Sequence, residues 1–231
     1  MLYPLLFAAG AVTLFFYVKE KLKAYSIKAL ILKSTVSVLF LFTAMAGLCR
    51  SFSVSGVLIL AGLLLGLMGD VWLDLKYVYR ADDRVYTYAG FLSFLVGHLF
   101  FITAMLMQYF AAGLYPYVLV PVAAAVVVGI LIGVLGPKIG MEYGEFKTVS
   151  MVYGAVLFAM TFIAGALALA YGFKTAALNR LFVGGALFAI SDLVLCGTYF
   201  GGKERKGDII VNYLTYYGAQ FLIASAIACI A

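Results

Sequence analysis

Charge is scarce in this sequence. Only 11% of its 231 residues are charged and 66% are hydrophobic, whereas soluble globular domains are roughly a quarter charged and about half apolar. Apolar runs of about twenty residues follow one another with short connections, and each run is long enough to cross a hydrocarbon core about 30 Å thick. A water-soluble protein is therefore excluded, and we expect one transmembrane domain over residues 1–231.

Cysteine and histidine are also scarce. Cys49, Cys196 and Cys229 are single residues in or beside apolar segments, with no CxxC pair, and we interpret them as small core residues. One histidine excludes a three-histidine zinc site. The sequence has no GxSxG elbow, Walker loop or dinucleotide fingerprint. We therefore expect neither a metal nor an organic cofactor.

Basic residues are in excess, with a net charge of +6, but they lie in short connections and form no continuous stripe. Nucleic acid is therefore not an expected partner. Thirteen of the sixteen Lys and Arg residues lie in or beside the first, third, fifth and seventh connections. The positive-inside rule places these connections in the cytoplasm and both termini outside. We expect a multi-pass protein of a bacterial cytoplasmic membrane rather than of the endoplasmic reticulum.

Apolar runs between charge or turn clusters predict about eight helices. They are expected at 2–18, 28–48, 53–75, 86–109, 114–135, 146–171, 180–200 and 209–230. An even number of spans agrees with two termini on one side of the membrane. The predicted fold class is an all-α, polytopic transmembrane helical bundle that is N-out and C-out.

An internal similarity suggests that this bundle is a four-plus-four parallel repeat. A small residue and an aspartate precede an apolar run in the third helix, at Asp70, and again in the seventh, at Asp192. Counting 28 residues beyond Asp70 reaches His98 in the fourth helix, and counting 28 beyond Asp192 reaches Gln220 in the eighth. A repeat of this kind predicts equivalent places for these residues in the two halves.

Three carboxylates within the apolar segments need a reason, because a charge at the bilayer centre costs at least about 2.5–3.5 kcal/mol on insertion scales. Asp192 is expected mid-helix, about 18 Å from the outer helix end at 1.5 Å per residue, and its alternative role is to hold two helices together by hydrogen bonding. Asp70 is expected nearer the cytoplasmic end, where an interfacial cap is the alternative. Asp74, one turn further, is most simply a solvated charge beside Lys76 and Arg80.

Further polar side chains on apolar segments are candidate substrate-binding residues. His98 is either a hydrogen-bonded core residue or a group that orients the substrate. Lys33 is either a partner for an anionic headgroup or a residue that snorkels to the interface. A polar stripe on the eighth helix and a tyrosine on the sixth complete the set, which is Asn212, Tyr216, Gln220 and Tyr153. Such a stripe lines a wet cavity or a helix interface, and Asp74 is kept as a further candidate.

Four stretches carry a family resemblance: LLLGLMGDVWL, AGFLSFLVGHLFFI, GGALFAISDLVL and YLTYYGAQFLI. With them the chain resembles the YhhN or lysoplasmalogenase-like family of eight-helix membrane proteins over essentially its whole length. The resemblance implies hydrolysis of the vinyl ether bond of a lysophospholipid substrate, a lysoplasmalogen, to a fatty aldehyde and glycerophosphoethanolamine or glycerophosphocholine. It also implies that Asp70 and Asp192 are catalytic. Asp74 stands where the family has an apolar residue.

The implied chemistry fits these residue types. Protonation of the terminal alkene carbon of a vinyl ether gives an oxocarbenium ion, which water captures as a hemiacetal that collapses to aldehyde and alcohol. Such a site needs a protonated acid and an ionised carboxylate. We expect Asp192, as the deeper residue, to be the acid and Asp70, nearer water, to be the base or the charge stabiliser.

Two other functions stay open at this point. A transporter would bind a cation or proton at Asp70, Asp192 and the polar stripe, and inverted repeats would favour it. A non-enzymatic lipid-binding bundle is the other alternative. For the hydrolase, we expect the two aspartates, His98, Tyr153 and the polar stripe to converge on one cavity that opens toward the cytoplasmic leaflet.

Overall fold

The computed structural model describes residues 2–23, 26–202 and 205–230, and this part of the chain is helical with short turns and no strands. Its eight long helices are α1 (Leu2–Lys21), α2 (Ile27–Arg50), α3 (Val54–Val78), α4 (Asp83–Tyr109), α5 (Pro116–Leu135), α6 (Lys147–Ala170), α7 (Ala176–Phe200) and α8 (Lys206–Ala226). The predicted all-α fold with about eight helices is confirmed.

Seven of the eight described helices, α1 to α7, are long and apolar enough to cross a membrane. The protein is therefore a multi-pass membrane protein. The eighth helix, α8, falls outside this group because its polar residues, among them Asn212 and Gln220, lower its mean hydropathy. These same residues formed the predicted polar stripe, and most of them are buried inside the bundle.

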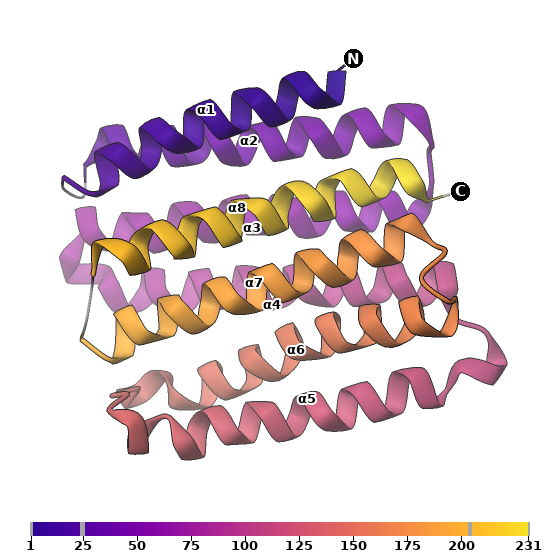
Figure 1. Cartoon of the computed structure of the whole chain (residues 1–231). Coiled ribbons are helices and arrows are strands. Elements are labelled where there is room, and N and C mark those ends of the chain that lie inside the picture. Colours follow the sequence, from indigo (N-terminus) through magenta and orange to yellow (C-terminus); the bar gives the residue numbers. More distant parts are fainter. Residues whose placement is uncertain (1, 24–25, 203–204, 231) are drawn as a thin grey trace.

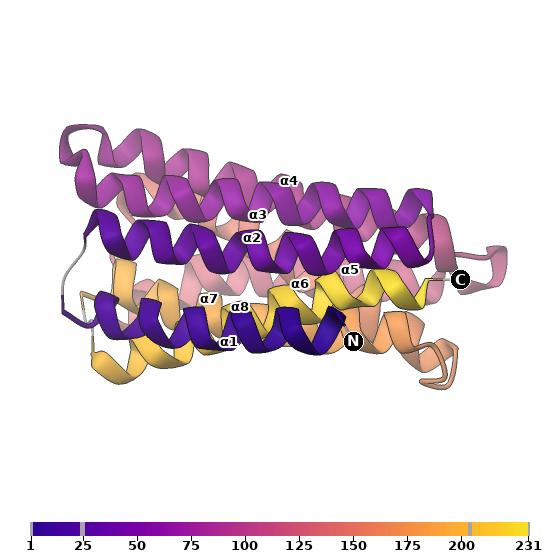
Figure 2. The ribbon, with the colours of Figure 1, turned by 90° about the horizontal axis from the view of Figure 1, so that it is seen from above.

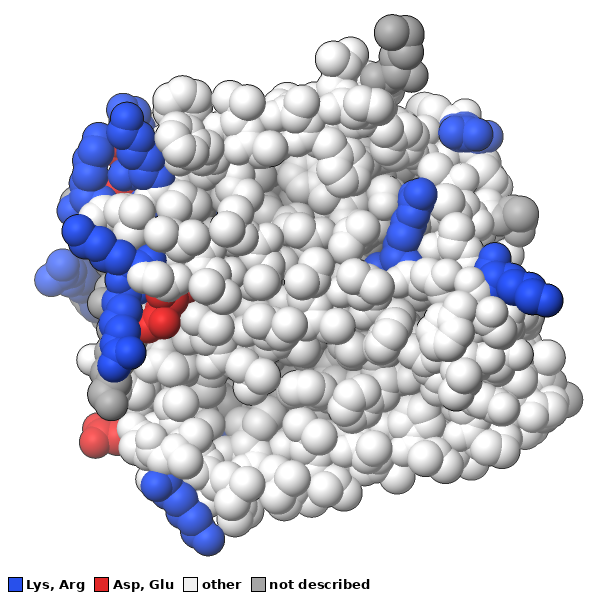
Figure 3. All heavy atoms as spheres, in the orientation of Figure 1, with Lys and Arg blue, Asp and Glu red and all other residues white. Residues whose placement is uncertain are grey.

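The helices run along a common direction, with α2, α3 and α4 on one side of the bundle and α1, α8 and α7 on the other (Figures 1 and 2). Both termini lie at one end, and the first, third, fifth and seventh connections lie at the opposite end (Figure 1). Most of the Lys and Arg side chains visible on the drawn face gather at that opposite end (Figure 3). Two parts of these basic connections, residues 24–25 and 203–204, lie outside the described residues. Which end faces the cytoplasm stays a prediction.

The helix contacts have the pattern that a four-plus-four repeat requires. Helix α3 packs against α4 as α7 packs against α8, and α2 packs against α8 as α6 packs against α4. A Cβ atom on Gly97 would lie 3.0 Å from the Gly62 carbonyl oxygen, and a Cβ atom on Gly184 would lie 3.3 Å from the Ala219 carbonyl oxygen. Gly184 follows Gly62, and Ala219 follows Gly97, by the same number of residues by which Asp192 follows Asp70. Small residues thus bring equivalent helices together in both halves.

This equivalence corrects the expected depths of the two aspartates. Helices α3 and α7 both have 25 residues, and Asp70 and Asp192 are each the seventeenth residue of their helix. Because α3 ends at Val78, three residues beyond its predicted end at residue 75, Asp70 is as far from the end of its helix as Asp192 is from Phe200. The prediction that Asp192 is the deeper residue is wrong.

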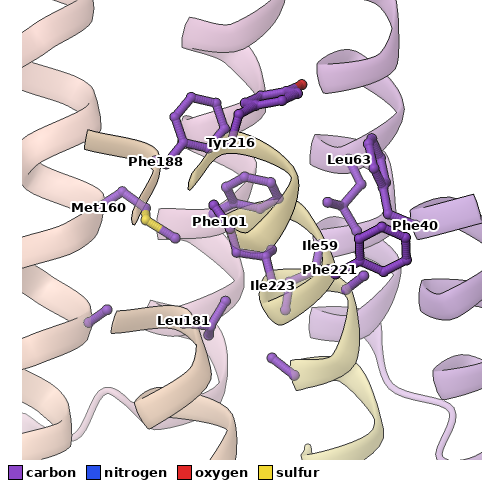
Figure 4. Close-up of a cluster of buried hydrophobic side chains, with 14 of the residues drawn as sticks. Phe40, Ile59, Leu63, Phe101, Met160, Leu181, Phe188, Tyr216, Phe221 and Ile223 are labelled. Atoms are coloured by element: carbon purple, nitrogen blue, oxygen red, sulfur yellow. The ribbon is translucent and has the colours of Figure 1, made fainter. Parts of the chain in front are cut away.

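Aromatic side chains fill the centre of the bundle beside the predicted polar residues. Phe188 lies next to Tyr216, with Phe101 close by (Figure 4), and the Phe188 and Tyr216 ring centroids are 5.3 Å apart. Cys49 is exposed, so its interpretation as a small core residue is wrong. Cys229 is partly buried and packs against the core, and Cys196 is partly exposed.

Candidate active site

One cavity of about 400 Å³ brings both aspartates together. It lies in the half of the bundle nearer the α5–α6 and α7–α8 connections, and residues of α5, α6 and α7 supply most of its wall. Its charged and polar lining includes six of the predicted site residues, which are Lys33, Asp70, Tyr153, Asp192, Asn212 and Tyr216. The rest of the wall is mainly aliphatic and aromatic. An amphiphilic molecule matches such a lining.

Both carboxylate oxygens of Asp70 have partners. Oδ1 lies 3.3 Å from the Lys33 ammonium nitrogen. Oδ2 accepts hydrogen bonds from the Ser37 hydroxyl at 2.7 Å and from the Tyr216 hydroxyl at 2.9 Å. The residue is only 3% exposed. A buried carboxylate with a cation and two donors around it is held in one orientation as an anion.

Asp74 and two lysines extend this arrangement into a buried group of four charges. Lys33 Nζ lies 3.1 Å from Asp74 Oδ1, and Lys21 Nζ lies 3.6 Å from the same oxygen. Asp74 is 7% exposed, so its prediction as a solvated interfacial charge is wrong. Lys33 does not snorkel to the interface either, because helix α2 packs against α3 and turns the ammonium toward the two aspartates. We call Lys21, Lys33, Asp70 and Asp74 the charge quartet.

Asp192 has a different environment. Its Oδ2 accepts a hydrogen bond from the Tyr153 hydroxyl. Among the described residues, no Lys, Arg or His nitrogen lies within ion-pair distance of Asp192, and its Oδ1 accepts no hydrogen bond. The residue is partly exposed, whereas Asp70 is buried. Two aspartates at equivalent helix positions therefore differ in charge compensation and in access from the cavity.

The cavity opens sideways onto the apolar surface of the bundle. Leu193 on α7 lines the cavity and is 56% exposed, and Leu131 and Leu135 on α5 also both line it and are exposed. The same face of the molecule is hollowed between α7 and α6 (Figure 3). In a membrane, this surface faces lipid chains. The opening thus connects the aspartates directly with the hydrocarbon region.

A family model described as the YhhN family matches residues 28–227, which include both aspartates and most of the cavity wall. The chain belongs to the YhhN family. No curated protein and no solved structure matches the chain. Helix α1 lies before the matched range, so Lys21 of the charge quartet is outside the part that defines membership in the YhhN family.

Three predicted residues of this YhhN protein do not line the cavity. Asp74 belongs to the charge quartet, and the other two, His98 and Gln220, lie behind the cavity wall. His98 is 2% exposed and packs edge-on against Phe188, with ring centroids 4.7 Å apart. Gln220 donates from Nε2 to the Tyr216 hydroxyl at 2.9 Å. Neither lines the cavity. The expectation that both contact the substrate region is wrong, because they face the bundle core, where they support the first layer of side chains.

Asn212 of the YhhN protein lines the cavity, as expected, but its amide nitrogen is occupied. It donates to the Ser191 carbonyl oxygen at 2.9 Å and to the Ser191 hydroxyl at 3.0 Å. These bonds join α8 to α7 directly beside Asp192. Asn212 therefore fixes the segment that carries the aspartate, while its own amide hydrogens are directed at protein atoms.

Ser37, Tyr217 and Lys21 were not predicted as site residues from the sequence. The Ser37 hydroxyl lies 3.3 Å from the Tyr217 hydroxyl, which donates in turn to the Lys33 carbonyl oxygen at 3.2 Å. Ser37 lies one helical turn after Lys33, a spacing that places both on one face of α2 and was the available signal. Among the described residues of the YhhN protein, no three His, Cys, Asp or Glu side chains are grouped as metal ligands would be.

Proposed function

We propose that this YhhN protein is a hydrolase of the bacterial cytoplasmic membrane that cleaves the vinyl ether bond of lysoplasmalogens. The observation that carries the proposal is the pair of unlike aspartates on one apolar cavity that opens toward lipid. Family membership supports the same reaction class. A lysophospholipid has one alkyl chain and a polar headgroup, which matches a cavity with an apolar wall and a few polar groups.

The different neighbours of the aspartates support different roles. Asp192 is the acid, because it has no cationic partner among the described residues and its Oδ1 is free of hydrogen bonds. Tyr153 holds the other oxygen and so positions the carboxyl group. Asp70 is the ionised partner that stabilises the positive charge of the transition state. This assignment agrees with the sequence-based expectation but rests on partners instead of depth.

The proposed reaction then has three steps, which are protonation, addition of water and collapse of the hemiacetal. Asp192 gives its proton to the alkene carbon remote from the ether oxygen, and the remaining positive charge is shared between the other alkene carbon and the ether oxygen. Water adds to the carbon that is bonded to the ether oxygen and returns a proton to the Asp192 carboxylate. Asp192 therefore acts first as acid and then as base. The resulting hemiacetal loses the glycerol oxygen as an alcohol and leaves a fatty aldehyde.

A cation transporter is less well supported. Lys33 Nζ lies between the Asp70 and Asp74 carboxylates, at 3.3 Å and 3.1 Å, and fills the place that a transported cation would take. Replacing an ammonium that is bound between two buried carboxylates carries a large desolvation cost. The polar residues near Asp192 also bind each other and leave no ring of free oxygen ligands in the described part of the site.

The decisive experiment measures aldehyde release by the purified protein in detergent from a lysoplasmalogen, with an ester lysophospholipid of the same chain length as the control. We expect stoichiometric aldehyde and glycerophosphoalcohol from the first lipid and no fatty acid from the second. Hydrolysis of the ester lipid alone would show that the protein cleaves an ester bond and not a vinyl ether bond. No release from either lipid would contradict the proposed function.

A further inference from the structure

Ser150 on α6 stands out among the residues around the cavity. It lines the cavity and is 7% exposed. Its hydroxyl oxygen is buried and has no hydrogen-bond partner, and among the described lining residues it is the one with such an atom. A buried hydroxyl without a partner lowers the stability of the fold, because it loses its hydrogen bonds to water without replacing them. A group that tolerates this cost is a candidate for binding a ligand.

Two other buried helical serines, Ser93 and Ser37, show what Ser150 lacks. Ser93 Oγ donates to the Ala89 carbonyl oxygen at 2.8 Å, and Ser37 Oγ bonds to both the Lys33 carbonyl and Asp70. This bond to the preceding turn is the usual way in which a serine within a helix satisfies its hydroxyl. Ser150 makes no such bond. Its hydroxyl is therefore available to a molecule in the cavity.

The place of Ser150 relative to the aspartates indicates what it would bind. Ser150 and Tyr153 are three residues apart on α6 and share one helix face, so about 4.5 Å of helix rise separates them. Tyr153 in turn holds Asp192. In a lysoplasmalogen whose alkene lies at Asp192, the free hydroxyl on the central glycerol carbon is only a few bonds from the reacting carbon. Helix α6 therefore places the Ser150 hydroxyl within the reach of that group.

We propose that Ser150 binds the free central hydroxyl of the glycerol backbone and thereby selects single-chain over two-chain lipids. The proposal rests on the proposed function for the orientation of the substrate. An acyl group at the central carbon removes the hydroxyl that donates to Ser150. It also places a second chain against a wall where Ser150 and Tyr153 are both buried. Both effects disfavour a two-chain lipid.

Binding of a lipid that cannot be cleaved tests this without turnover. The ligands are a saturated 1-O-alkyl lysophospholipid, its 2-deoxy analogue and the phosphate-free 1-O-alkylglycerol, each titrated into the full-length protein in detergent. We expect the wild type to bind the lysophospholipid about tenfold more tightly than the 2-deoxy lipid, because a hydrogen bond of about 1.4 kcal/mol corresponds to a tenfold ratio. In Ser150→Ala this ratio should fall to about one. Ser93→Ala is the matched control and should keep the wild-type ratio.

Other outcomes overturn the proposal in distinguishable ways. If Ser150→Ala keeps the tenfold ratio, or if the wild type shows none, Ser150 does not bind the central hydroxyl. If the effect of Ser150→Ala persists with the 2-deoxy lipid and vanishes with the phosphate-free alkylglycerol, its partner is the phosphate. A wild type that binds with the expected ratio but releases no aldehyde from the vinyl ether substrate would contradict the proposed function and leave the Ser150 site in place.

Discussion

At the scale of single residues, two aspartates of the same type and helix position acquire different properties from their neighbours. Lys33, Ser37 and Tyr216 surround Asp70, whereas Tyr153 alone holds Asp192 among the described residues. The difference lies in α2 and α6, which pack against the two aspartate helices at equivalent places. A lysine on one helix and a tyrosine on the other give the two carboxylates different environments, and on this basis we propose Asp70 as the ionised partner and Asp192 as the proton donor.

Asp70→Asn and Asp192→Asn should each lower aldehyde release by about 10²–10⁴-fold, because asparagine neither donates a catalytic proton nor carries the negative charge. Asp192→Asn should keep its stability in detergent, since hydrogen bonds between membrane helices contribute only about 0.6 kcal/mol on average. Asp70→Asn leaves Lys33 with Asp74 as its remaining carboxylate and should lose stability, so its turnover is measured on the folded fraction. Asp82→Asn, at an exposed position outside the cavity, is the control. Near-normal turnover in both site variants would rule out the two-carboxylate mechanism.

Lys33→Met should destabilise the protein by about 3–5 kcal/mol, because it leaves the buried Asp70 and Asp74 carboxylates without their shared cation. Thermal unfolding in detergent measures the effect. Lys28→Met removes an exposed lysine with a 3.7 Å contact to Glu20 and should change stability by less than about 1 kcal/mol. Equal melting temperatures for the two variants would show that the charge quartet does not stabilise the fold.

The burial of Asp74 excludes Asp74→Asn as a control for the aspartate variants. A solvated carboxylate there would make Asp74→Asn a neutral substitution, but this residue contacts both Lys33 and Lys21. Sequence patterns did not show this contact, because Lys21 was counted only as a topology signal and Lys33 was expected to bind a headgroup or to snorkel to the interface. Which face of a helix meets which neighbour depends on long-range packing, and a single sequence does not record that directly.

At the scale of helices, the long apolar runs of the sequence predicted the number of helices and most of their boundaries. Predicted and observed boundaries differ by a few residues, because a span of about twenty apolar residues is the strongest local signal a sequence carries. The largest consequence came from the end of α3, at Val78 instead of residue 75. That small difference had made Asp70 look nearer to its helix end, and therefore less deep, than Asp192. The position of a site along a helix was therefore less predictable than the helix itself.

Glycines at helix contacts offer a test of the packing between α3 and α4. A Cβ atom on Gly62 would lie 2.4 Å from the Phe101 ring and 2.8 Å from the Gly97 carbonyl oxygen, which forces these two helices apart. Gly62→Ala should therefore lower the melting temperature, with a loss of about 1–3 kcal/mol. A Cβ atom on Gly197 meets nothing within 4 Å among the described atoms, so Gly197→Ala should be neutral or slightly stabilising. The opposite order would contradict the close α3–α4 contact.

At the scale of the whole molecule, the alternating connections predict which groups are accessible from each side of the membrane. Cys49 lies near the end of α2 that is shared with the termini, and Lys28 lies near the other end. In intact cells, an impermeant maleimide should label a variant in which Cys49 is the single remaining cysteine. It should not label a Lys28→Cys variant that lacks the three native cysteines. Labelling of position 28 from outside would reverse the orientation derived from the basic connections.

The charge quartet has an electrical consequence. Its two lysines and two aspartates sum to no net charge, although they lie within the membrane-spanning helices. One elementary charge moved through a membrane potential involves about 2.3 kcal/mol per 100 mV, so a neutral group that stays in place exchanges almost no energy with the field. We expect aldehyde release in proteoliposomes to be the same at zero potential and at an imposed potassium diffusion potential, with no accompanying current. Catalysis that couples to voltage would require a charge to leave the quartet during turnover.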